Sequence, residues 1–169
     1  MSIDVNDLLA GNKAYAASFT AGSLPMPPAR KLAVVACMDA RLDPLPFLGL
    51  HLGDTHVIRN AGGRATDDAI RSLAISERLL GTDAIVVIHH TDCGMLTFSN
   101  DDIRRKIRSD LGNGAYDKAI QVDFLPFADV AKSVRDDVET VKASPLIPDS
   151  IPVYGFIYDV RSGQLSPVE

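Results

Sequence analysis

Short, almost wholly apolar runs alternate with amphipathic segments along this chain. The runs Leu32–Cys37 and Ala84–His90 carry apolar side chains at nearly every position, which is typical of strands that are buried on both faces. Two further runs, His56–Arg59 and Val153–Tyr158, also predict strands. The pattern therefore predicts a sheet whose central strands contact the core on both sides.

Helical segments lie before and between these strands. Four stretches carry apolar residues at three- and four-residue spacing, and these are Val5–Phe19, Thr66–Gly81, Ile103–Leu111 and Ala128–Val141. Thr66 is followed by two aspartates, as at a helix start, and Gly81 is a helix stop. The turn residues 161–163 predict a hairpin into an edge strand that begins near Leu165.

The alternation of strands and helices predicts the α/β class, with a mostly parallel sheet that helices cover on both faces. A chain of 169 residues has the length of one domain, and no repeat or linker divides it. We therefore expect a single domain over residues 1–169. The prolines at positions 25, 27 and 28 forbid a helix, so residues 1–28 are expected to form a separate helical arm and its connector.

The formal net charge of −5 argues against a general affinity for nucleic acid or anionic membrane. No apolar run reaches the roughly 18 residues that span a bilayer, and the acidic N-terminus lacks the features of a secretory signal. We therefore expect a cytoplasmic protein. In a reducing cytoplasm, a disulfide between the two cysteines, Cys37 and Cys93, is disfavoured, and metal binding or catalysis is the better expectation.

Three residues that can bind a metal lie at or just beyond the strand ends. Cys37 ends the first predicted strand, His90 ends the third, and Cys93 follows shortly after. Ligands bind beyond the carboxyl ends of parallel strands, so the three side chains are candidates for one site. Two thiolates and an imidazole favour zinc over magnesium or calcium, and they leave a fourth tetrahedral position for water, as in catalytic zinc sites.

The spacing of His90 and Cys93 alone is a weak signal, because buried cysteines and hydrogen-bonded histidines are common in protein cores. The residues after Cys37 change this picture. Along an extended chain, Cys37, Asp39 and Arg41 point to one side. A carboxylate and its guanidinium partner would then lie beside the metal, and a purely structural cysteine needs neither.

Two motifs and the segment between them stand out, namely Cys37-x-Asp39-x-Arg41, Gly53–Asn60 and His90-x-x-Cys93-Gly94. Together they resemble the signature of the β-class carbonic anhydrases, in particular the small bacterial and fungal branch, which includes carbonyl sulfide hydrolase relatives. The resemblance implies a central sheet of four parallel strands with an antiparallel edge strand. It also implies a homodimer or a dimer-based oligomer, in which the N-terminal helical arm embraces the partner subunit.

The resemblance also implies roles for individual residues. By it, Cys37, His90 and Cys93 hold one Zn²⁺ per chain, and Asp39 and Arg41 form the catalytic dyad beside the metal. Three further residues are candidates for the wall of the substrate pocket, and these are Arg59, Asn60 and Gly94.

This chain departs from the family pattern at a few positions. It has no tryptophan, and Val34 stands where members with an inhibitory bicarbonate site carry one, so that site is not expected. Ala40 replaces a common serine at a position that points away from the metal. Gly62 and Gly63 replace a bulkier pair that is common after the Arg-Asn motif.

The remaining polar residues near the motifs receive simpler interpretations. His89 precedes the ligand and is expected on the opposite side of its strand. Asp92 is a candidate partner for the ligating groups. His51 and His56 are expected in exposed positions, where either could shuttle protons.

We expect this site to hydrate carbon dioxide reversibly to bicarbonate and a proton. Zinc lowers the pKa of bound water toward about 7, and the resulting zinc-bound hydroxide is the nucleophile. Asp39 would orient it by accepting a hydrogen bond, and Arg41 would keep Asp39 ionised. Alternatively, the same site hydrolyses carbonyl sulfide or carbon disulfide, and the motif residues do not separate these substrates. Remoter alternatives are a non-catalytic, zinc-stabilised dimerisation module, which leaves the dyad idle, and redox sensing through a Cys37–Cys93 disulfide.

Overall fold

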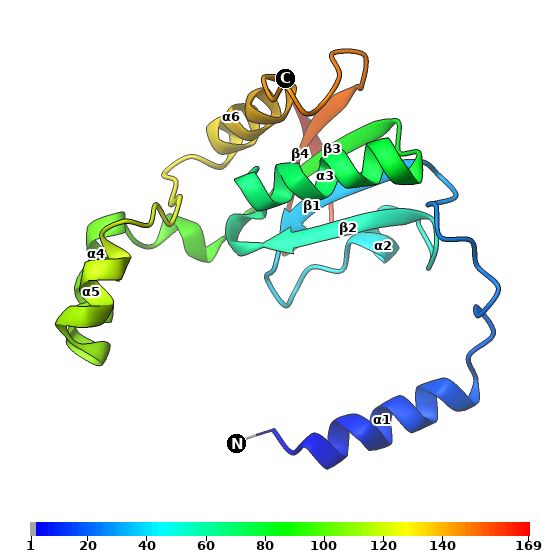
Figure 1. The fold of residues 1–169 in the computed structure, drawn as a ribbon, viewed down its shortest axis with the longest axis horizontal. Helices are drawn as coiled ribbons and strands as arrows, with labels where there is room; N and C mark the ends of the chain where they lie inside the picture. The colour runs from blue at the N-terminus through cyan, green and yellow to red at the C-terminus, as the bar shows by residue number, and fades with distance from the viewer. Residues whose placement is uncertain (1–2) are drawn as a thin grey trace.

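Five strands form one sheet in the order β2-β1-β3-β4-β5 (Figure 1). In this computed structural model, which describes residues 3–169, the strands are β1 (Leu32–Cys37), β2 (Thr55–Asn60), β3 (Ala84–His90), β4 (Val153–Tyr158) and β5 (Leu165–Val168). The pairs β1–β2, β1–β3 and β3–β4 are parallel, and β4–β5 is antiparallel. The predicted α/β class and sheet are therefore confirmed, including the antiparallel edge strand.

Six α-helices and two short 3₁₀ turns connect the strands in the described part of the chain. The helices are α1 (Val5–Ala17), α2 (Pro44–Phe47), α3 (Asp67–Leu80), α4 (Asn100–Leu111), α5 (Asn113–Ala119) and α6 (Val130–Lys142), and the turns are η1 (Ala61–Gly63) and η2 (Gly94–Leu96). The four predicted helices correspond to α1, α3, α4 and α6. The sequence pattern missed α2 and α5, because four and seven residues are too few to show a helical period.

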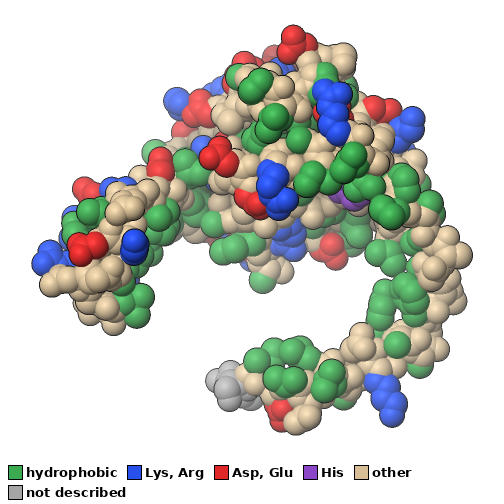
Figure 2. Space-filling model, viewed as in Figure 1, with side chains coloured by type: hydrophobic (Ala, Val, Ile, Leu, Met, Phe, Trp, Pro, Cys, Tyr) green, Lys and Arg blue, Asp and Glu red, His purple; other side chains and the backbone are tan. Residues whose placement is uncertain are grey.

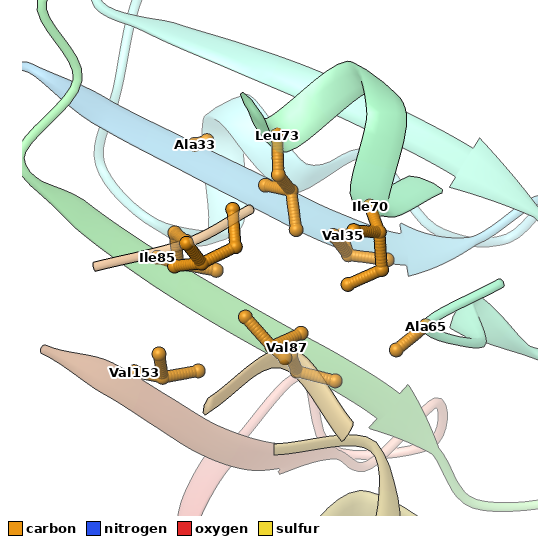
Figure 3. Packing of buried hydrophobic residues seen from close by; sticks show 10 residues of the cluster. Ala33, Val35, Ala65, Ile70, Leu73, Ile85, Val87 and Val153 are labelled. Carbon is orange, nitrogen blue, oxygen red and sulfur yellow. The ribbon is translucent and has the colours of Figure 1, made fainter. Parts of the chain in front are cut away.

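The two faces of the sheet are covered unequally. On one face, α3 and α6 pack over β1, β3 and β4. The core between them includes Val35, Leu73 and Val87 (Figure 3), and Val141 of α6 belongs to the same cluster. On the other face, the smaller cluster around Val34 and Ile88 is covered by the short α2 through Phe47. Helices thus lie on both faces, as predicted, although one face carries most of the helical mass.

Two helical elements extend away from the sheet (Figure 1). One is the α4–α5 pair, and the other is α1, which has no buried residue. Hydrophobic side chains are exposed along α1 (Figure 2), and the large ones on this segment are Val5, Leu8, Leu9, Tyr15 and Phe19. Across residues 3–169, we find no helix with the length and apolar character needed to cross a membrane.

The register of the sheet brings the candidate residues Cys37 and His90 to the same end of the sheet. Cys37 is the last residue of β1 and pairs with Asn60 at the end of β2. His90 is the last residue of β3 and pairs with Tyr158 at the end of β4. Because these strands are parallel, their carboxyl ends lie side by side, and both side chains reach the same end of the sheet.

Candidate metal centre

The ligand atoms of Cys37, His90 and Cys93 all lie within 4.8 Å of one another. The three residues are almost fully buried, with 4%, 0% and 2% of their surface exposed. Asp92 adopts a left-handed conformation (φ 54°) between His90 and Cys93, and this turn lets both neighbours contribute to one cluster. The structure thus brings together the three side chains that the strand-end argument selected.

The hydrogen bonding of His90 leaves one ring nitrogen available to bind a metal ion. Nδ1 lies 2.9 Å from the carbonyl oxygen of Thr91, which can only accept, so Nδ1 carries the proton. The lone pair is therefore on Nε2, which is buried and has no hydrogen-bond partner among the described residues. Buried polar atoms are rarely left unpaired, so this nitrogen fits a bound cation, and the donor set of two sulfurs and one nitrogen fits zinc.

The electrostatics of the two cysteines also favour a cation. The neighbouring Cys93 thiol, together with backbone N–H groups of Asp39 and Gly62, lowers the pKa of Cys37. The bond to Cys37 and burial raise the pKa of Cys93 well above its usual range. Two thiolates at this separation repel each other, so both ionise together only when a cation lies between them.

Asp39 and Arg41 form an ion pair beside the cluster. Nη2 of Arg41 donates to Oδ2 of Asp39 at 2.7 Å, and Nε donates to Oδ1 at 2.9 Å. The Arg41 bonds hold the pKa of Asp39 far below its usual range. Oδ2 of Asp39 also lies 3.8 Å from Nε2 of His90, so an ionised carboxylate faces the group of three candidate ligands.

The backbone brings this pair together in a different way from the one expected. An extended chain was predicted to place Cys37, Asp39 and Arg41 on one side. Instead β1 ends at Cys37, and Leu42 N–H donates to the carbonyl oxygen of Asp39 at 3.0 Å, which closes a turn. Expecting an extended chain was therefore wrong, because the strand ends before Asp39 and the turn folds Arg41 back onto it.

Asp92 contacts the dyad. Its carboxylate accepts from Nη1 of Arg41 at 2.8 Å, and its carbonyl oxygen accepts from Nη2 at 2.9 Å. The turn between the candidate ligands His90 and Cys93 thus holds the guanidinium group from the other side. Asp92 supports the site through Arg41, whereas Thr91 supplies the oxygen that orients His90.

A pocket of about 380 Å³ opens beside the cluster. Its lining is mostly apolar or backbone, and consists of Cys37, Met38, Asp39, Ala61, Gly62, Cys93, Gly94, Met95, Thr97 and Phe98. Gly94 lines this pocket, whereas Arg59 and Asn60 brace the backbone next to it. Arg59 donates to the carbonyl oxygens of Cys37 and Asp39, at 3.0 and 2.7 Å.

The other histidines occupy different environments. The side chain of His51 is 89% exposed, as expected. His56 is half-buried, contrary to expectation, and its Nδ1 lies 2.6 Å from the Ser76 hydroxyl on α3. His89 is fully buried, and its ring contacts Asp137 and Phe127, so it occupies the α6 side of the sheet as strand alternation predicts.

Sequence reasoning missed Met95, Phe98 and Arg64. Met95 and Phe98 line the pocket only because η2 follows Cys93, and no local pattern signals this turn. Arg64 pairs with Asp137, which lies 73 residues further along the chain. The one available signal was Gly62-Gly63, which marks a loop that approaches the strands closely.

A mostly parallel sheet with a buried Cys-His-Cys cluster at the ends of adjacent strands defines an α/β metalloprotein with a catalytic-type site. Comparison with known proteins agrees. A family model described as carbonic anhydrase matches residues 32–165. Beta-carbonic anhydrase 1 of Mycobacterium tuberculosis is 47% identical over 165 residues, which cover 96% of each chain.

Two further comparisons extend this result. The crystal structure of carbonic anhydrase from Streptococcus mutans is 48% identical and superposes over 100% of both chains with a TM-score of 0.92. A carbon disulfide hydrolase of Acidithiobacillus thiooxidans is 37% identical over 161 residues, which cover 84% of this chain and 79% of that protein. This chain belongs to the β-class carbonic anhydrase family, which includes carbon disulfide hydrolase relatives.

Proposed function

We propose that this chain catalyses the reversible hydration of carbon dioxide to bicarbonate and a proton, at one zinc ion per chain held by Cys37, His90 and Cys93. The observation that carries the proposal is the cluster of three buried ligand atoms within 4.8 Å, with Asp39 and Arg41 beside it. When bound, zinc supplies a nucleophile at neutral pH by lowering the pKa of water.

The dyad orients the attacking water in this proposal. Asp39 is ionised because Arg41 donates to both of its carboxylate oxygens. Each oxygen keeps further lone pairs, and Oδ2 faces the cluster, so it can accept a hydrogen bond from the water. Arg41 also holds Asp39 in place, which would keep the carboxylate from becoming a fourth ligand of the metal.

The walls of the pocket suit a small apolar substrate. Met95 and Phe98 provide apolar surface, and Gly62 and Gly94 leave room for a linear triatomic molecule. A carbon dioxide molecule in this pocket would lie close to Asp39 and to the two cysteines, because all three line it. Holding reactants in a fixed geometry is a large part of catalysis.

Carbon disulfide or carbonyl sulfide is the second candidate substrate. The observation that favours it is the 37% identity to a carbon disulfide hydrolase. All three substrates are linear molecules with an electrophilic carbon, so the same dyad would serve each of them.

A parallel assay tests the proposal. Zinc-loaded protein is given carbon dioxide in a stopped-flow instrument, and carbonyl sulfide or carbon disulfide in a sulfide-release assay. We expect fast carbon dioxide hydration that falls strongly in Asp39→Asn. Fast sulfide release with negligible carbon dioxide hydration would show that carbonyl sulfide or carbon disulfide, and not carbon dioxide, is the substrate. No turnover of any of the three by the zinc-loaded protein would contradict the proposed enzyme.

We also propose that the chain assembles as a homodimer or a multiple of one, with residues 1–28 as an arm on the partner subunit. The support is α1, which buries none of its residues and exposes Leu8 and Leu9 by 55% and 62%. Isolated helices of this length are marginal in water, so α1 needs a surface to pack against. A cytoplasmic location suits the two free thiols of Cys37 and Cys93.

A further inference from the structure

A buried charged network lies next to the metal cluster, and the proposed reaction does not use it. Arg64 donates from Nε and Nη2 to the two carboxylate oxygens of Asp137, at 2.7 and 3.3 Å. Nε2 of His89 lies 3.1 Å from the same carboxylate. The side chains of Arg64, Asp137 and His89 are 12%, 5% and 0% exposed. Burying charged groups is unfavourable unless they are paired, so Arg64 and Asp137 each depend on the other, and His89 adds a further hydrogen-bonding contact.

The ring of His89 is fixed from three sides. Its Nε2 is also 3.2 Å from the carbonyl oxygen of Gly63. Both neighbours of Nε2 accept hydrogen bonds, so this nitrogen carries the proton. The ring stacks on Phe127, with centroids 5.4 Å apart. Because His90 follows directly, the fixed ring of His89 also sets the backbone from which the metal ligand projects.

The network holds the first wall of the metal pocket, which is η1 (Ala61–Gly63). A Cβ added at Gly63 would lie 2.9 Å from the backbone nitrogen of Cys37 and 2.8 Å from the carbonyl oxygen of Ile88. The turn therefore rests directly on the backbone of β1 and β3. Arg64, the residue after this turn, is hydrogen-bonded to Asp137, and the Gly63 carbonyl oxygen is hydrogen-bonded to His89.

The network also holds the second wall, which contains Met95. Nη1 of Arg64 donates to the carbonyl oxygen of Leu125 at 2.8 Å, and Leu125 has a left-handed backbone (φ 57°). Two residues later, Phe127 N–H donates to the carbonyl oxygen of Met95 at 3.2 Å. One guanidinium group thus connects α6 to both segments that enclose the pocket.

We propose that Arg64, Asp137 and His89 are positioning residues for the metal centre, which hold η1 and the Met95 segment against Cys37 and Cys93. The proposal rests on the zinc site proposed above. It assigns an influence on metal retention to Arg64 and Asp137, although neither residue is a ligand. Groups that orient metal ligands from outside typically change metal affinity or activity by about 10–100-fold when they are altered.

The test measures zinc release from the folded, zinc-loaded protein to an excess of chelator. We compare the wild type with Asp137→Asn, which removes the charge that Arg64 and His89 bind, and with Arg64→Lys, which keeps a charge opposite Asp137 but loses the bond to Leu125. Val141→Ala is the matched control, because it removes buried atoms from the same helix away from the network. The visible spectrum of the Co²⁺-substituted proteins reports the ligand geometry independently of turnover.

We expect zinc release to be about tenfold faster or more in Asp137→Asn, less accelerated in Arg64→Lys, and close to the wild-type rate in Val141→Ala. The Co²⁺ spectrum should shift in the two network variants alone. Wild-type release and an unchanged spectrum in both network variants would overturn the positioning role, as would equal acceleration in Val141→Ala. If Asp137→Asn does not fold, Arg64→Lys decides by the same criteria. A wild type that binds no zinc would instead overturn the proposed metal site itself.

Discussion

Arg41 donates three hydrogen bonds to the carboxylate of Asp39, from its backbone N–H, Nε and Nη2, at 2.9, 2.9 and 2.7 Å. The pair is further anchored because Asp92 accepts from the same guanidinium group. A carboxylate held in this way stays ionised and keeps one orientation next to the metal cluster. The relationship makes Asp39 and Arg41 a unit, and their substitutions should behave accordingly.

The first prediction concerns this unit. Asp39→Asn should lower turnover by about 10–100-fold while zinc remains bound, because the acceptor charge is lost but the three ligands are intact. Arg41→Ala should also retain zinc and lower turnover, because the freed carboxylate of Asp39 can then bind the metal where water is needed. The double variant should be scarcely worse than either single one. Kinetics and zinc analysis on all four proteins check this, and additive losses would contradict it.

The second prediction concerns the ligand set. Cys93→Ser should lose zinc and most activity, because a serine hydroxyl remains protonated where a thiolate is needed. Elemental analysis should show one zinc per wild-type chain and little in the variant. His51→Ala, which removes an exposed histidine, should keep its metal. Full zinc content in Cys93→Ser would remove this residue from the ligand set.

The third prediction concerns pH and the start of α4. Ser99 and Asp102 form a capping box, and the bonds from Ser99 lower the pKa of Asp102. A carboxylate whose pKa is lower in the folded state stabilises the fold above its unfolded pKa of about 3.9, and this contribution disappears as the pH falls through the folded value.

Asp102→Asn should therefore lower the urea midpoint at pH 7 by more than it does at pH 3. Asp101→Asn serves as the control, because it removes a carboxylate from the same helical turn without removing a capping bond. A difference between the wild type and Asp102→Asn that stays constant from pH 7 to pH 3 would show that the charge of Asp102 does not stabilise the helix.

The fourth prediction concerns the contact of β4 with α6. A Cβ added at Gly155 would lie 2.5 Å from Cγ1 of Val134 and 3.1 Å from Cγ2 of Val138. Gly155→Ala should lower the free energy of unfolding by about 1–3 kcal/mol through overpacking. Val134→Ala in the same chain should recover part of this loss. Gly114→Ala, in open space on α5, should be neutral or slightly stabilising. Equal urea midpoints for wild type and Gly155→Ala would refute the close contact.

The fifth prediction concerns the arm. Deletion of the residues before Ala29, or Leu8→Asp in the full chain, should shift sedimentation from a dimer or larger assembly toward the monomer. Lys13→Glu changes an exposed charge on the same helix without removing apolar surface, and it should keep the assembly. An undiminished assembly after deletion would show that other surfaces hold the subunits together.

The features that the sequence predicted well are local or periodic. The apolar runs of β1 and β3 identified the two strands, and their final residues identified Cys37 and His90. The end of β1 at Cys37 was predicted, but the turn after it was missed, because its signal is a single residue, Asp39, whose carboxylate accepts from the Arg41 backbone N–H. The pairing of Arg64 with Asp137 was also missed, since it joins a loop to a helix that is remote in the sequence, and only the folded chain brings them together.

The position of Cys37 on β1 and of His90 on β3 also has a consequence for folding. The two proposed ligands become neighbours only after a parallel crossover connection has formed, and such long-range pairings are slow to form because the intervening loop must close first. His90 and Cys93 lie near each other even in an unfolded chain and could engage a metal weakly. Binding of the metal by all three residues therefore requires completed β1–β3 pairing. The time course of metal uptake during refolding should accordingly report when the central sheet assembles.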